Sequence, residues 1–155
     1  MLKKISELCD NMGHLFLPTN LISDFEKAIL NAIYEVWPGM NVVGCRFHLT
    51  QSWYRQIQFL GIITEYKNKC NIGMWLRHSF GLLFLNPSEV MSYFMEDFMP
   101  QQCPFNNHVL AYSQYLLNNY ILNTSTFPPK LWAEATSALT RTTNVCESFH
   151  SDFDQ

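Results

Sequence analysis

The sequence predicts an α/β fold in which a small strand-helix-strand-helix core precedes a long block of helices and a C-terminal helix. Two short apolar runs, at residues 20–23 and 41–44, each lead into a segment with helical periodicity, which favours parallel pairing of two strands. No strand pattern follows residue 61. We therefore expect an α/β core over residues 1–61, a helical insertion over residues 62–140 and a last helix over residues 141–155.

The first elements of the core follow from apolar spacing and from helix breakers. Residues 1–17 predict a short amphipathic helix that runs into Gly13 and Pro18, and the strand at residues 20–23 ends directly before Asp24. The next helix is predicted from Phe25 to the stop at Pro38-Gly39. Its expected buried stripe consists of Phe25, Ala28, Ile29, Ala32, Ile33, Val36 and Trp37.

The strand at residues 41–44 leads into a third helix that should end at Gly61. Its apolar stripe consists of Leu49, Trp53, Ile57 and Leu60. Functional groups collect at the carboxyl ends of parallel strands, so Asp24 and Cys45 are expected at the same edge of the sheet.

The helical block is predicted from turn signals and aromatic spacing. Helices are expected over residues 72–85, 87–98 and 105–122, and Asn144 is expected to open a last helix that carries Glu147 and His150. Six aromatic residues at helical spacing predict core packing rather than base stacking: Trp75, Phe80, Phe84, Tyr112, Tyr115 and Tyr120.

Charge is unevenly distributed along the chain. The net charge is −3, which argues against a uniformly basic nucleic-acid binder. Residues 46–77, however, hold Arg46, Arg55 and three further basic residues, with Glu65 as the only acid. Arg46 and Arg55 are candidate DNA contacts, and a solvated helix surface is the alternative interpretation.

Composition also limits which cellular compartment and which classes of enzyme fit the chain. The 5 cysteines are odd in number and widely spaced, and no signal-peptide pattern precedes them, which favours a reducing intracellular compartment. No apolar run is long enough to span a membrane. The chain gives no support to a serine hydrolase or a nucleotide-dependent enzyme, because it lacks Gly-x-Ser-x-Gly and glycine-rich phosphate loops.

Three short motifs carry a resemblance to a known family. They are Ser-Asp-Phe-Glu-Lys-Ala at residues 23–28, Cys45-x-x-His48, and Thr-Asn-x-x-Glu-Ser-Phe-His at residues 143–150. In this order, with helices before the last motif, the chain resembles the Mutator-like element (MULE) transposase domain. The resemblance implies a DDE-type transposase on an RNase H-like fold that acts on DNA in the nucleus, and it allows an oligomer.

The resemblance also implies a metal site. Three acids of such enzymes hold two divalent ions, usually Mg²⁺ or Mn²⁺, for DNA cleavage and strand transfer. Asp24 matches the second acid and Glu147 the third, with Cys45, His48, Asn144 and His150 as supporting motif residues. No Asp-Gly-Thr-Phe type segment for the first acid occurs in residues 1–20. The chain is therefore expected to be N-terminally truncated and inactive, or alternatively to be a domesticated DNA-binding or protein-interaction module.

Two other interpretations of these residues stay open. Ser23-x-x-Glu26 and Asn144-x-x-Glu147 each fit a helix capping box, so both motifs could cap helix N-termini instead of binding metal. A zinc site is the second alternative, since tetrahedral zinc needs four ligands. Its ligands would be Cys45, His48, Cys146 and His150.

Overall fold

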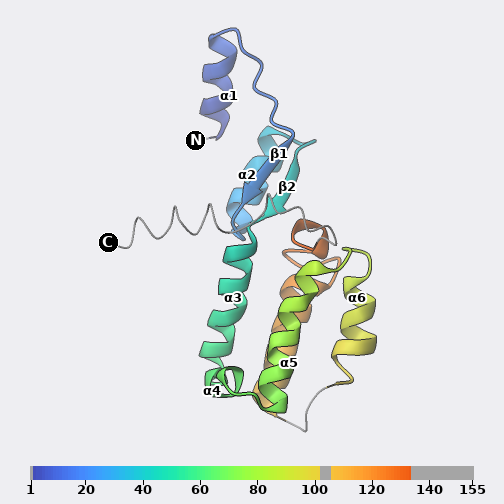
Figure 1. The fold of residues 1–155 in the computed structure, drawn as a ribbon. Coiled ribbons are helices and arrows are strands. Elements are labelled where there is room, and N and C mark those ends of the chain that lie inside the picture. Colours follow the sequence, from blue (N-terminus) through green and yellow to red (C-terminus); the bar gives the residue numbers. More distant parts are fainter. Residues whose placement is uncertain (1, 102–105, 134–155) are drawn as a thin grey trace, which may run out of the picture. The chain divides into compact units, whose positions relative to one another are not determined.

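The computed structural model describes residues 2–101 and 106–133 of the chain. It divides the chain into two compact units, Met1–Cys45 and Arg46–Gln155. The first contains two helices and a small sheet, and every regular element in the described residues of the second is helical (Figure 1). The helix that begins at Arg46 thus belongs to the helical unit. No helix within the described ranges combines the length and apolar character that a membrane crossing requires.

The first unit is built around a two-stranded parallel sheet. Strands β1 (Asn20–Ser23) and β2 (Asn41–Gly44) pair in register from Asn20 opposite Asn41 to Ser23 opposite Gly44. Helix α2 (Lys27–Val36) connects them, as a parallel pair requires. The predicted strand-helix-strand order and parallel pairing are therefore confirmed, while the assignment to a partial RNase H-like core stays a prediction.

Helix α2 differs from its prediction at its start and in its buried face. Phe25 lies before the helix, and Glu26 at the N-cap is extended. The helix buries Leu30 and Ile33, whereas Ala28 and Ile29, predicted to be buried, are exposed. The apolar pattern of this segment is nearly continuous, so spacing alone did not fix which side of the helix faces the sheet. The predicted stop is confirmed, since the helix ends before Trp37.

The short amphipathic helix predicted within residues 1–17 is confirmed as α1 (Leu2–Asn11), and none of its residues is buried. It ends at Gly13, which has φ +76°, and the amide of His14 donates to the carbonyl of Cys9 at 2.9 Å. This bond is the one that closes a helix before a left-handed glycine. Lys3 bonds Glu35 of α2 at 2.5 Å, but both side chains are exposed, so the ion pair contributes little stability.

The second unit begins with α3 (Arg46–Phe59), which ends two residues before Gly61, the predicted stop. Gly61 has φ +73°, and the amide of Ile62 donates to the carbonyl of Ile57 at 3.2 Å. Ile57 and Ile62 are both buried, and apolar residues at these two positions are typical of this helix ending. A short helix that the sequence did not predict, α4 (Ile63–Lys67), follows directly.

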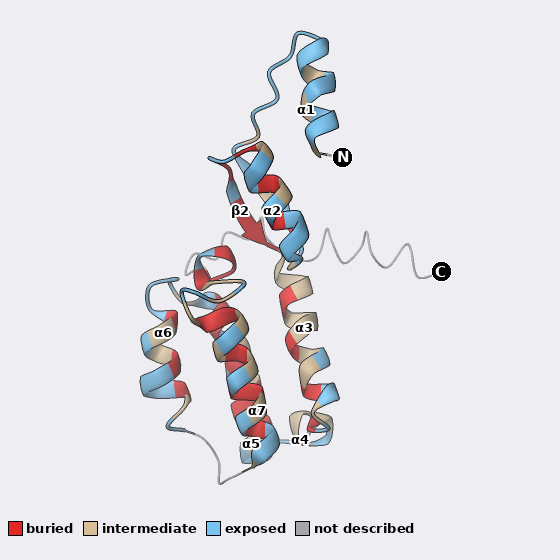
Figure 2. Cartoon of the chain, turned by 180° about the vertical axis from the view of Figure 1, so that it is seen from behind, coloured by how far each residue is buried: buried red, intermediate tan, exposed pale blue. Residues whose placement is uncertain are grey.

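The remaining helices match the predicted segments but are less regular than expected. Helix α5 (Asn71–Ser79) continues as a 3₁₀ turn, η1 (Phe80–Phe84), while α6 (Val90–Tyr93) and α7 (Asn107–Leu116) continue as π-helical turns. Those turns are η2 (Phe94–Phe98) and η3 (Leu117–Ile121), and a 3₁₀ turn, η4 (Pro129–Leu131), comes last. Figure 2 shows the buried residues of this unit running along α5 and α7.

Trp53 of α3 lies at the centre of the second unit's core. It is fully buried, and its ring meets the rings of Tyr120 and Trp132 edge-on at centroid distances of 5.7 and 5.6 Å. Trp75 stacks on Phe98 at 4.3 Å and donates its indole N–H to the Phe98 carbonyl. Core packing of the aromatic residues is confirmed for Trp75, Tyr112 and Tyr120 but is wrong for Phe84, which is 61% exposed.

Candidate metal site at the end of strand β1

Asp24 directly follows the last residue of β1 and is exposed to solvent. Ser23 pairs with Gly44, and the amide of Cys45 donates to the carbonyl of Ser23 at 2.8 Å. Asp24 and Cys45 therefore leave the carboxyl ends of two adjacent parallel strands. This confirms the predicted edge of the sheet, where ligands commonly bind in α/β folds.

The backbone after Asp24 is held by a close contact between Phe25 and Gly44. The Phe25 ring occupies the space where any Cβ on Gly44 would lie. Ser23, which is buried, donates its hydroxyl to the Asp24 carbonyl at 3.3 Å. The backbone at Asp24 is thus contacted by Ser23, while the next residue, Phe25, packs against the end of β2.

The capping-box interpretation of Ser23 and Glu26 is wrong. Ser23 is the last residue of β1, and the N-cap of α2 is Glu26, with φ −117° and ψ 115° and no side-chain cap hydrogen bond. A capping serine would have to stand at the N-cap and accept from an amide of the first turn. Asp24 and Glu26 are therefore not explained by helix capping, which leaves a ligand role for Asp24 open.

The other predicted ligands are only partly described by the structure. Cys45 is a half-buried thiol just before α3, and His48 is a half-buried residue in the first turn of that helix. Asn144, Cys146, Glu147 and His150 lie outside the described residues. Among residues 2–101 and 106–133, no three His, Cys, Asp or Glu side chains gather in a group that could hold a metal. The Asp24–Glu147 pair and the four-ligand zinc site stay predictions.

The basic residues of the second unit have different surroundings. Arg55, Lys67 and Lys69 are exposed. The Arg46 guanidinium lies 5.2 Å from the centre of the Phe84 ring, so this cation already has an aromatic contact. Arg77 donates to the carbonyls of Tyr66 and Asn68 and thereby closes the end of α4. We therefore assign Arg77 to helix packing, whereas Arg55 keeps the exposure that a phosphate contact needs.

Phe25 and Gly44 are residues near the site whose roles sequence reasoning missed. Apolar spacing places Phe25 in the buried stripe of the helix, and it places Gly44 at the end of a strand without a contact of its own. A glycine at the last position of a buried strand signals a close approach of another group. That signal pointed to Gly44 but not to Phe25, because the contact depends on where α2 starts.

Comparison with known proteins relates the N-terminal part of the chain to one protein family. Residues 1–52 match the family model of the MULE transposase domain. The match covers the N-terminal third of the chain, which is therefore similar to this family. The matched MULE segment includes Asp24, Cys45 and His48, whereas Glu147 lies beyond it. No curated protein and no solved structure matches the chain.

Proposed function

We propose that this transposase-derived chain retains part of a divalent-metal site, with Asp24 and Glu147 as its two carboxylates. The observation that carries the proposal is the placement of Asp24, which is exposed at the carboxyl end of β1 and lies within the MULE segment. Mg²⁺ and Mn²⁺ prefer carboxylate oxygens, and they keep several waters when few protein ligands are present. Two carboxylates suffice for one loosely held ion.

We further propose that residues 1–155 alone do not cleave DNA. Cleavage by two ions about 4 Å apart needs carboxylates that offset the repulsion between the cations. The family motifs supply two acids in this sequence, and Asp10, in helix α1, has no motif around it. An ion held by Asp24 and Glu147 would activate the attacking and the leaving oxygen less effectively than a complete pair of ions.

The test measures Mn²⁺ binding and DNA cleavage with the whole chain. Asp24→Ala and Glu147→Ala should each weaken Mn²⁺ binding, whereas Asp10→Ala, which removes another exposed acid of the first unit, should not. Labelled duplex DNA should stay intact with Mg²⁺ or Mn²⁺. Cleavage that disappears in both the Asp24 and the Glu147 variants would overturn the proposed inactivity, and Mn²⁺ binding that is unchanged in both would overturn the metal site.

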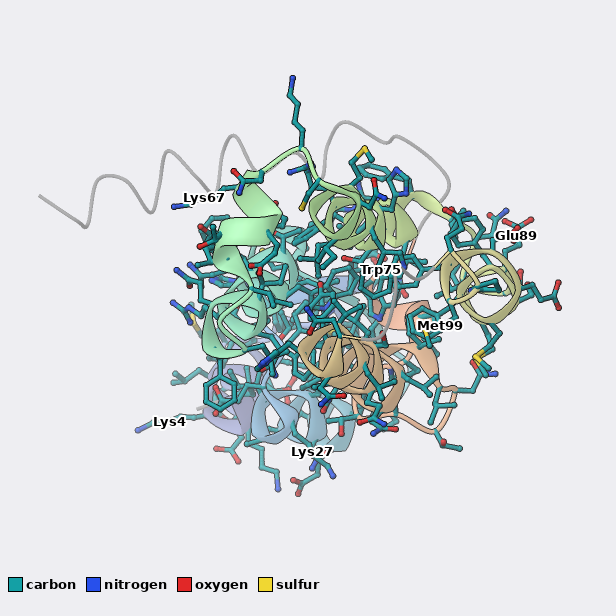
Figure 3. The ribbon with its side chains drawn as sticks, turned by 90° about the horizontal axis from the view of Figure 1, so that it is seen from below. Lys4, Lys27, Lys67, Trp75, Glu89 and Met99 are labelled. Carbon is teal, nitrogen blue, oxygen red and sulfur yellow. The ribbon has the colours of Figure 1, made fainter. Side chains whose placement is uncertain are left out.

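A second candidate function is DNA binding without metal, in the nucleus. Its support is the exposed basic group formed by Arg55, Lys67 and Lys69, which we name the α3–α4 basic surface. Figure 3 shows Lys67 on one side of the helical unit and Glu89, from the acidic segment around α6, on the other. When basic and acidic residues are separated in this way, a protein of net negative charge can still bind phosphate at a basic surface.

Salt dependence tests this second function, because phosphate contacts release counterions. DNA affinity should fall steeply as salt rises and should weaken in Arg55→Ala and Lys67→Ala. Lys27→Ala removes an exposed cation from helix α2 of the first unit, so it is the matched control and should bind as the wild type does. Binding that ignores both salt and the two substitutions would refute a phosphate contact at this surface.

A further inference from the structure

An exposed aromatic ring stands beside the α3–α4 basic surface. Phe59, the last residue of α3, is 83% exposed, the largest exposed fraction of any large hydrophobic side chain in the described residues. A single exposed ring is common on protein surfaces, so the case for a partner depends on the cations of the same two helices. The residue one helical turn earlier on the same helix is Arg55, also exposed.

The ring and the cations are held by a rigid framework. The glycine turn at Gly61 fixes the end of α3, and α4 packs against α3. The rings of Tyr54 and Tyr66 join the two helices at a centroid distance of 5.5 Å. Arg55 follows Tyr54, and Lys67 follows Tyr66, so each cation is next in sequence to a residue of this contact. Phe59 therefore does not depend on a loop for its position.

The charge around Phe59 is suited to phosphate. Glu65 is the only acid of residues 46–88. One of its carboxylate oxygens is buried and has no hydrogen-bond partner within the described part of the chain. The exposed charges of α3 and α4 are thus those of Arg55, Lys67 and the neighbouring Lys69. An anionic partner fits this surface better than a second apolar protein face.

We infer that the α3–α4 basic surface binds single-stranded DNA, with Phe59 stacking on an unpaired base and the three cations contacting the backbone. Base faces are accessible in a single strand and covered by neighbouring pairs in a duplex, which is why exposed aromatic rings beside cations select unpaired strands. This inference rests on the proposed DNA binding and assigns its substrate class.

The experiment compares a labelled thymidine oligonucleotide with a blunt duplex of the same length, using the whole chain and fluorescence anisotropy. Phe59→Leu keeps an apolar side chain but removes the ring, and Phe59→Trp restores a stacking surface. Phe84→Leu is the control, because Phe84 is also an exposed aromatic residue of the helical unit. Thermal melting checks that each variant is folded.

The single strand should bind more tightly than the duplex, and Phe59→Leu should weaken that binding at least about 5-fold, the loss of one base stack. Phe59→Trp and Phe84→Leu should bind as the wild type does. Single-strand binding unchanged in Phe59→Leu would overturn the inference while leaving DNA binding intact. An equal loss on both DNAs would also overturn it and would indicate a wedge into duplex steps. If the wild type binds neither DNA, the proposed DNA-binding function fails as well.

Discussion

The ring of Phe25 packs against the α-carbon of Gly44, in the space that a side chain at position 44 would fill. Phe25 follows Asp24, and Gly44 precedes Cys45, so this contact joins the two strand ends of the candidate site. The contact also explains why the last residue of β2 carries no side chain.

Gly44→Ala should therefore destabilise the first unit. The added methyl would collide with the Phe25 ring, which must then move, and such overpacking costs about 1–3 kcal/mol. Hydrogen exchange of the β1 and β2 amides measures the change, since it reports each unit separately. Gly39→Ala is the control, because a Cβ at Gly39 meets nothing within 4 Å. Equal protection in the two variants would contradict a tight Phe25 contact.

Gly73 makes the corresponding close approach in the helical unit. A Cβ at this position would collide with the carbonyl oxygens of Glu65 and Asn68, which are backbone atoms and cannot rotate away. Gly73→Ala should force α5 away from α4 and lower the unfolding midpoint of this unit by more than side-chain overpacking does. Gly81→Ala, where a Cβ has open space, should melt close to the wild type.

Arg77 should behave as a structural residue and not as a DNA contact. Its guanidinium donates to two carbonyls, of Tyr66 and Asn68, and lies 5.9 Å from the centre of the Tyr66 ring. Arg77→Lys keeps the charge but loses the planar guanidinium that donates to two carbonyls at once. Charge-assisted hydrogen bonds of this kind contribute about 1.5–3 kcal/mol to folding stability. Urea unfolding should show lower stability with nearly unchanged DNA affinity, the reverse of Lys67→Ala. Lower DNA affinity in a stable Arg77→Lys protein would contradict this role.

Local signals in the sequence were sufficient for most helix and strand ends. Gly61 predicted the end of α3 because a left-handed residue was needed there, and the alternation of strand and helix predicted the parallel pair that places Asp24 beside Cys45. These features depend on a few neighbouring residues, so they can be read from short stretches of sequence.

Features that depend on distant contacts were not predictable in the same way. Helix α2 starts after Phe25 because that ring packs on Gly44, a residue far along the chain. Phe84 follows the helical spacing of Phe80 but lies in a 3₁₀ turn, where the period changes and the side chain is exposed. The structural role of Arg77 could not be predicted either, because its carbonyl partners carry no sequence signal.

Alkaline pH should destabilise the helical unit through Tyr112. Its hydroxyl bonds Ser79 at 3.0 Å, and burial raises the pKa of Tyr112 well above its usual value, with the Ser79 bond opposing that shift. The stabilising effect is therefore complete below the ordinary tyrosine pKa of about 10, and it is lost as pH rises further, because the unfolded chain releases a proton that the folded one keeps. Ser79 also donates to the Leu76 carbonyl, so Tyr112→Phe leaves that hydroxyl partnered.

The Tyr112→Phe variant tests this alkaline sensitivity. It should lose about 0.5–1.5 kcal/mol at neutral pH, for one hydrogen bond, and should show a shallower fall in stability above pH about 10. Some slope should persist, because burial also raises the pKa of Tyr115, whose hydroxyl lies 3.1 Å from that of Tyr120. Urea midpoints over the alkaline range measure both effects, and Tyr34→Phe, at an exposed position in the first unit, is the control. A slope identical in wild type and Tyr112→Phe would show that Tyr112 does not govern the alkaline transition.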